Sequence, residues 1–175
     1  LLILAILTIL LLSRDNNEVE NTEVVNDFHQ TSDYSMRDFT MTVMDETGHP
    51  SRIISGKDMA HYPDDDSSVI HSLKAHIMAQ GKETWLITSN QGDTKGNGDN
   101  ILLTGNVIII KANNDGTELH TEKLHLDTKH DTAYTDVAAT FNSPNGVTDT
   151  VGFHAVLADE TINLHSRVKG NYDAP

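Results

Sequence analysis

Apolar and polar residues alternate along most of the chain from residue 34 onward. Phe39, Met41 and Val43, for example, are separated by two threonines. A period of two predicts strands with one face turned to a core. After Arg14, every candidate amphipathic helix is interrupted by Thr, Asn, Asp or Gly. The pattern therefore predicts an all-β protein of many short antiparallel strands.

One unit of the pattern, residues 85–110, consists of a strand, a polar turn placed at 92–100, and a second strand that Gly105-Asn106 can bend or bulge. Similar units recur along the chain. Their equivalent positions lie 33, 32 and 31 residues apart, at Met59, Gly92, Leu124 and Ala155. A repeat of this length without a helical period predicts a stack of β-hairpins.

Turn signals separate the remaining strands. They stand at 45–50, 80–82, 113–116 and 143–146. Gly48 and Gly146 are expected to be turn glycines that set the geometry of the sheet edges, and Asn145-Gly146 suits a primed hairpin turn. The expected strands cover residues 39–43, 51–62, 67–78, 85–91, 101–111, 118–126, 134–141, 147–157 and 161–168.

A stack of hairpins buries one face of its sheet, and two facing sheets would make a sandwich or an open jelly roll. The inward positions carry mostly Ile, Val, Leu and Met. A space lined by these side chains could hold hydrocarbon, or it could be an ordinary core, and the period alone does not separate the two.

Residues 1–12 are apolar except for Thr8. We interpret residues 1–13 as the C-terminal part of a membrane anchor, because the polar residues that follow form no cleavage site of small residues. A signal-peptide core and a buried helix are the alternatives. Residues 14–33 are polar and acidic and are expected to form a flexible tether. The folded domain is expected to cover residues 34–175.

Charge and chemistry narrow the function classes. The net charge of −14 would repel nucleic acid. The sequence has ten histidines in no metal-ligand spacing, no cysteine and no catalytic motif. We expect exposed histidines, a solvated acidic turn at 64–66, no metal, no cofactor and no enzymatic activity.

Several motifs together resemble the LptC family of lipopolysaccharide-export proteins. Besides the anchor and the tether, they are residues 34–40, 43–50, 55–56, 61–66, 103–107 and 166–172. The resemblance covers the whole chain and implies a twisted open β-jelly roll in the periplasm, preceded by a single transmembrane helix in the inner membrane of a Gram-negative cell. It also implies that the protein receives lipopolysaccharide from the ABC transporter formed by LptB, LptF and LptG and passes it to LptA.

On this reading, the interior is an apolar groove for acyl chains, and the free sheet edges are docking surfaces. Residues 39–43 are the expected edge for the transporter, and the expected edge for LptA is Val168, Lys169, Gly170, Asn171 and Tyr172. The expected groove residues, for each of which core packing is the alternative, are Phe39, Met41, Val43, Ile54, Met59, Ile70, Ile87, Val107, Ile109, Leu124, Leu126, Phe141, Val151 and Leu164.

The sequence allows two explanations of the acidity and two functions. The high acidity is unfavourable for a ligand that carries phosphates, and it reflects either a head group kept outside in salt or a salty habitat. The alternative function is an LptA-like structural β-domain, soluble or anchored, that assembles end to end without being the acceptor at the inner membrane.

Overall fold

The structure is a computed structural model that describes residues 31–112, 116–157, 159 and 161–172. Every regular element in this part of the chain is a β-strand. The strands are β1 (Tyr34–Met44), β2 (Pro50–Tyr62), β3 (Ser67–Ala79), β4 (Lys82–Lys95), β5 (Asn100–Lys111), β6 (Glu118–Asp127), β7 (Thr132–Ser143), β8 (Gly146–Val156) and β9 (Thr161–Tyr172).

The described residues contain no helix that is long and apolar enough to cross a membrane. The expected anchor at 1–13 and all but the last residues of the expected tether at 14–33 lie outside them. The first strand begins at Tyr34, where the folded domain was expected to start.

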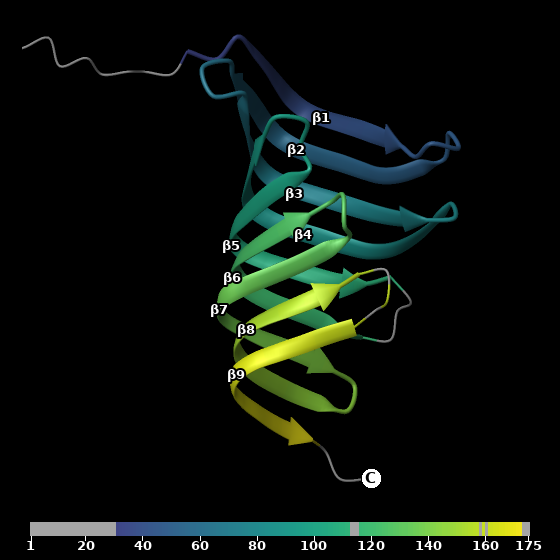
Figure 1. Cartoon of the computed structure of the whole chain (residues 1–175), viewed down its shortest axis with the longest axis vertical. Helices are drawn as coiled ribbons and strands as arrows, with labels where there is room; N and C mark the ends of the chain where they lie inside the picture. The colour runs from purple at the N-terminus through teal and green to yellow at the C-terminus, as the bar shows by residue number, and fades with distance from the viewer. Residues whose placement is uncertain (1–30, 113–115, 158, 160, 173–175) are drawn as a thin grey trace, which may run out of the picture.

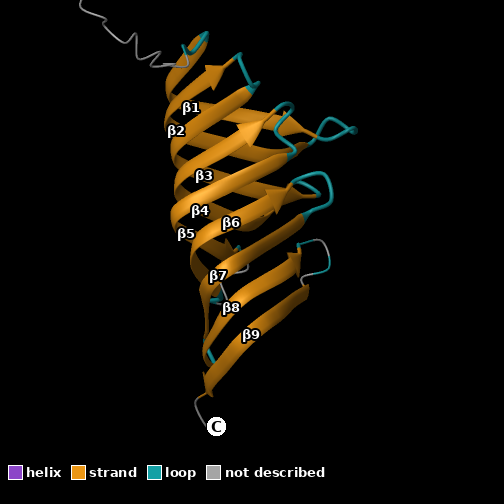
Figure 2. Cartoon of the chain, turned by 60° about the vertical axis from the view of Figure 1, so that its left-hand side comes forward, coloured by secondary structure: helices purple, strands orange, loops and turns teal. Residues whose placement is uncertain are grey.

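The nine strands form one antiparallel sheet in sequence order, from β1 to β9. The sheet folds back on itself, so that each strand contributes to both of its facing halves (Figures 1 and 2). The expected pair of sheets is therefore one continuous sheet. This arrangement is an open β-jelly roll whose edges are β1 and β9.

The strands bend where the register between neighbours shifts. Between β5 and β6 the shift falls between Thr104 and Val107. Gly105 and Asn106 lie there with φ of 73° and 48°, as their tolerance of left-handed backbone predicted. Buried hydroxyls secure several bends: Thr121 Oγ1 donates to the carbonyl of Ala138 at 2.8 Å.

Pairing places three of the four equivalent repeat positions in one row of the sheet. Met59 pairs with Ile70, Ile70 with Gly92, Gly92 with Leu103, and Leu103 with Leu124. Ala155 lies in the next row, in line with Leu126. The hairpin repeat is thus real. The turn placed at 92–100 was too long, because β4 continues to Lys95 and Gly92 is a buried strand residue.

The core fills the space between the two halves of the sheet. Its largest fully buried side chains are Phe153, Ile87, Leu103, Leu124, Val107 and Thr135. Burial of one large apolar side chain stabilises a fold by about 1.5–3 kcal/mol. The core therefore holds the bend closed and leaves the free ends of the strands to form a cleft.

Candidate functional site: an apolar cleft between two lips

The ends of the strands form two lips that face each other across the interior (Figure 1). Lip 1 comprises the strand ends at Tyr62, Lys95, Asp127 and Val156 with the described residues of the turns that follow them. Lip 2 comprises the strand ends at Met44, Ala79, Lys111 and Ser143 with the described residues of their turns. Backbone contacts between strands join only sequence neighbours in the described chain. Side chains alone therefore hold the lips together.

Two rows of paired residues build the inner surface of lip 2. The rim row is Val43, Arg52, Ile77, Trp85 and Lys111. The wall row lies two residues deeper and is Met41, Ile54, Ala75, Ile87, Ile109, Leu119, Phe141, Thr148 and Gly170. The wall row is apolar apart from Thr148 and Gly170.

The inner cleft lies between the wall row and β8–β9. Its lining on lip 2 includes Trp85, Ile109 and Phe141, and Phe153 and Ile162 line it on the other side. The cavity volume is only about 40 Å³. Ligand pockets usually hold about 300–1,000 Å³, so the inner cleft in this conformation is too narrow for a ligand of ordinary size.

The same apolar surface continues to the C-terminal edge of the sheet. A second cavity of about 380 Å³ is lined by Phe141, Ile162, Leu164, Val168 and Tyr172, together with Thr148 and Gly170. Phe141 and Ile162 line both cavities. The cleft therefore leads toward β9.

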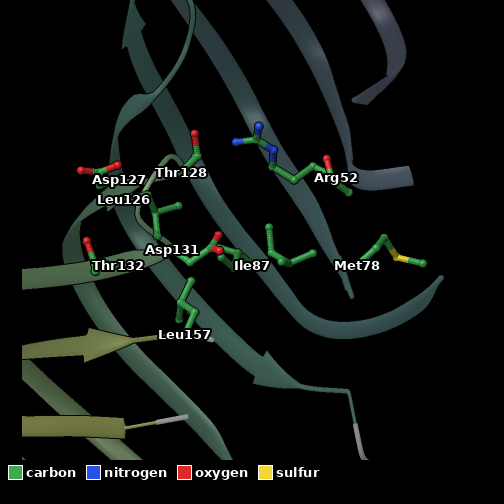
Figure 3. A pocket seen from close by; sticks show the side chains of 11 residues that line it. Arg52, Met78, Ile87, Leu126, Asp127, Thr128, Asp131, Thr132 and Leu157 are labelled. Carbon is green, nitrogen blue, oxygen red and sulfur yellow. The ribbon is translucent and has the colours of Figure 1, made fainter. Parts of the chain in front are cut away.

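A third cavity, of about 230 Å³, opens between the lips nearer the N-terminal half (Figure 3). Arg52 and Met78 line it from lip 2, and Asp127 and Asp131 line it from lip 1. Ile87 and Leu126 form part of its apolar lining. This cavity is the polar part of the mouth.

The predicted groove residues lie at different positions in the structure: some line a cavity, some pack in the core, and a few are exposed. Ile109, Phe141 and Leu164 line the apolar cleft, and Ile87 and Leu126 line the third cavity. Those packed in the core or against it are Phe39, Ile54, Met59, Ile70, Val107 and Leu124, and Val107 and Leu124 have no exposed surface. Val43 is half-buried and stands in the rim row. Met41 stands in the wall row but is 37% exposed near the β1 edge.

Val151 lies on the outer face of the sheet. It pairs with Ala138 and Ser166, which are both exposed. The register shift beside it reverses the alternation on which its expected inward position depended. Most residues that line the inner cleft were not predicted as groove residues, and the large apolar side chains among them include Trp85, Leu119, Phe153 and Ile162. The pairing register between neighbouring strands could have identified such residues, since Leu119 pairs with both Ile109 and Phe141.

The predicted partner edge, residues 168–172, is the end of β9, and it is exposed throughout. Val168 and Tyr172 are 53% and 65% exposed, although both also line the C-terminal cavity. A free apolar edge next to the end of a cleft is suited to strand addition by another β-protein.

The two predicted turn glycines differ in their surroundings. Gly48 has φ of 82° and open space around it. A Cβ on Gly146 would overlap the carbonyl oxygen of Asn171 in β9. A bulky residue at Gly146 would therefore disturb the β8–β9 pairing itself, and not only docking at the edge.

His61 of β2 binds the residues at the start of β1, the strand at the other edge of the sheet. His61 Nδ1 lies 2.7 Å from Asp33 Oδ1, and its Nε2 lies 3.1 Å from Asp66 Oδ1. The ring of Tyr34 stacks on His61 at 4.6 Å. Hydrogen bonds to the two carboxylates raise the pKa of His61, and the bond to His61 lowers the pKa of Asp33.

Histidines at other positions also pair with carboxylates, which the expectation of freely solvated histidines did not include. His76 contacts Glu83 at 3.0 Å, and His120 contacts Glu118 at 2.9 Å. Within the described residues, no group of three His, Asp or Glu side chains is placed to hold a metal ion.

Comparison with known proteins agrees with this architecture. The sequence matches the family described as "Lipopolysaccharide-assembly, LptC-related" over residues 1–173. The fold is similar to the crystal structure of LptH from Pseudomonas aeruginosa, the LptA-homologous periplasmic component of a lipopolysaccharide transport device. That match has a TM-score of 0.56 and 10% sequence identity, and it covers 70% of this chain and 95% of LptH. No curated protein matches the sequence.

The bent sheet, the apolar interior and the two free edges define the class of LptA-like β-jelly rolls. The chain belongs to the LptC-related family of lipopolysaccharide-assembly proteins. It is a component of lipopolysaccharide transport in Gram-negative bacteria, and this family is a transport family rather than an enzyme family.

Proposed function

We propose that the protein receives lipopolysaccharide from the inner-membrane ABC transporter of LptB, LptF and LptG and passes it to LptA. The acyl chains would travel in the apolar cleft. The observation that carries this proposal is the sharing of Phe141 and Ile162 between the inner cleft and the cavity at β9. A chain held in the cleft is thereby guided toward the C-terminal edge.

The two edges support a direction of transfer. In this proposal β1 joins the transporter's own jelly roll, and residues 168–172 join LptA. Strand addition at each edge would align the interiors of successive domains into one trough, because the wall row reaches from Met41 in β1 to Gly170 in β9. We also propose that residues 1–13 belong to a single inner-membrane helix and that residues 34–175 form the periplasmic domain.

The cleft is tested by photo-cross-linking in cells. A photoreactive residue at Ile109 should capture lipopolysaccharide, because Ile109 lines the inner cleft. Ile108 is a matched control, since it is the next residue and pairs with Thr88 and His120 on the outer face. Equal adducts from both positions, or adducts from Ile108 alone, would contradict transport through the cleft.

A carboxylate at the same position gives an independent test. The variant Ile109→Asp would place a charge in an apolar cleft and should abolish the cross-link formed from Phe141. The edge assignment is tested with photoreactive residues at Val168 and Met41. The first should capture LptA and the second the transporter, and an exchange of these partners would reverse the proposed direction.

A further inference from the structure

The inner surface of lip 2 is mainly apolar, but the charged side chains that it carries are all basic. The rim row contains two cations, Arg52 and Lys111, and the rim and wall rows contain no Asp or Glu among their described members. The whole protein carries a net charge of −14, with 26 acidic and 12 basic residues. The inner surface of lip 2 is therefore less acidic than the protein as a whole.

Both cations lie at the border between the apolar wall and the mouth. Arg52 lines the third cavity beside Ile77 and Ile87. Lys111 lies with its Nζ 5.9 Å from the ring centre of Trp85, which lines the inner cleft. Long basic side chains next to an apolar surface usually lay their apolar stems along that surface and keep the charged end at its border.

Pairing fixes the distance between the two positions. Arg52 and Lys111 are separated by Ile77 and Trp85 in the rim row. Three strand spacings correspond to about 14 Å between the two backbones. Two phosphates at opposite ends of one disaccharide head group can therefore contact the two cations at the same time.

Carboxylates stand on the side of the third cavity that faces Arg52. Asp127 and Asp131 line the third cavity across from Arg52 (Figure 3). Asp127 Oδ2 accepts a 2.7 Å contact from His130 Nδ1, so this carboxylate already has a cationic partner when the histidine is protonated. An anionic head group would be attracted to lip 2 and repelled by lip 1.

We propose that Arg52 and Lys111 form a phosphate subsite on the rim of lip 2 for the phosphorylated head group of the amphiphile whose tails fill the cleft. This inference rests on the proposed function, since it needs tails in the cleft. It also answers how so acidic a protein takes an anionic lipid. The subsite fixes the orientation of the ligand, with the head group at lip 2 and the tails along the wall row.

The test compares two amphiphiles of the same acyl composition. One is lipid A with both phosphates, and the other is the same lipid after enzymatic removal of the phosphates. Displacement of a fluorescent fatty-acid probe from the full folded chain measures the affinity for each. The variants are Arg52→Gln with Lys111→Gln, and the control is Lys74→Gln, because Lys74 is exposed and pairs with Ser55 and Thr88 on the outer face.

The double variant should lose roughly ten-fold or more in affinity for the phosphorylated lipid, since a hydrogen bond to a charged group contributes about 1.5–3 kcal/mol. Its affinity for the dephosphorylated lipid should stay within about two-fold of the unsubstituted protein. Arg52→Lys, which keeps the charge, should retain most of the affinity, and Lys74→Gln should retain all of it. Denaturation curves of the same samples show that each variant is folded.

The outcomes separate the subsite from the cleft. If the protein binds both lipids equally and the double variant changes neither affinity, the subsite is overturned while the cleft stands. If the protein binds neither lipid, the proposed function fails and the subsite with it. Calorimetry with inorganic phosphate alone distinguishes the source of the anion: binding that Arg52→Gln abolishes without any lipid would assign the rim to a free anion and overturn the proposal.

Discussion

Gly92 is the position where one added methyl group has the most clearly defined consequence. It is a buried residue of β4, paired with Ile70 and Leu103. A Cβ at this position would lie 2.6 Å from Leu73 Cδ1 and 3.3 Å from Leu103 Cδ2. Both leucines are core residues, with 3% and 0% of their surface exposed. Gly92→Ala therefore overfills the core beside the bend.

The expected magnitude has two opposing parts. Overpacking of a core by an added methyl group costs about 1–3 kcal/mol. Alanine in a strand gains about 0.5–1 kcal/mol over glycine through the entropy of the unfolded chain. The central values of the two terms leave a net loss of about 1 kcal/mol, which corresponds to a fall in Tm of about 2–4 °C for a chain of this size.

Urea denaturation followed by the fluorescence of Trp85, the single tryptophan, measures this loss. Leu73→Val shortens the side chain that the new Cβ meets. The double variant should be more stable than the sum of the two single losses predicts, with a coupling energy of at least about 0.5 kcal/mol. Gly170→Ala is the control, because the atoms nearest to its Cβ would belong to the exposed ring of Tyr172. Additive losses, or a Gly92→Ala variant as stable as the parent, would refute the overpacking argument.

Four further substitutions have expected outcomes. The pKa of His61 is raised in the folded state, so the protonated side chain stabilises the fold. This contribution is complete below the ordinary pKa near 6.5 and is lost as pH rises through the raised pKa. His61→Gln should therefore remove this pH dependence from Tm measured between about pH 5 and 9. Thr150→Val removes hydroxyl bonds of 3.1 Å to two backbone carbonyls and should lower the free energy of unfolding by about 1–3 kcal/mol. Gly146→Ala should lower both stability and capture of LptA from β9, whereas Gly48→Ala should lower stability by only about 1 kcal/mol.

The strands and their order could be predicted because each follows from local information. Alternation defines the inner face, and Gly and Asn mark the turns and the bend at 105–106. Other bends carry no such mark. Asp38, Ser72 and Arg167 also have φ near 50°, although nothing in their neighbourhood in the sequence distinguishes them. Their conformation is imposed by the fold of the whole sheet.

The depth of each side chain could not be predicted. Alternation places Val107 and Ile109 on the same face, yet the first is a fully buried core residue and the second lines the cleft. The difference depends on how far each lies from the bend and on which distant strand faces it. The sequence also does not indicate that Arg52 and Asp131 line the same cavity, because the two residues belong to opposite lips that meet only in the folded sheet.

The closed state of the cleft has a physical consequence for transport. The lips share no strand pairing in the described chain, so they can separate without breaking a backbone hydrogen bond. Opening would expose mainly apolar side chains of the inner cleft, such as Trp85 and Phe153. In the proposed transport, an incoming acyl chain would cover the same surface again and would thereby offset the free energy needed to open the cleft. An open sheet with two free edges can open in this way without losing strand pairing. In a closed barrel the first and last strands are paired, so opening would break the backbone hydrogen bonds between them.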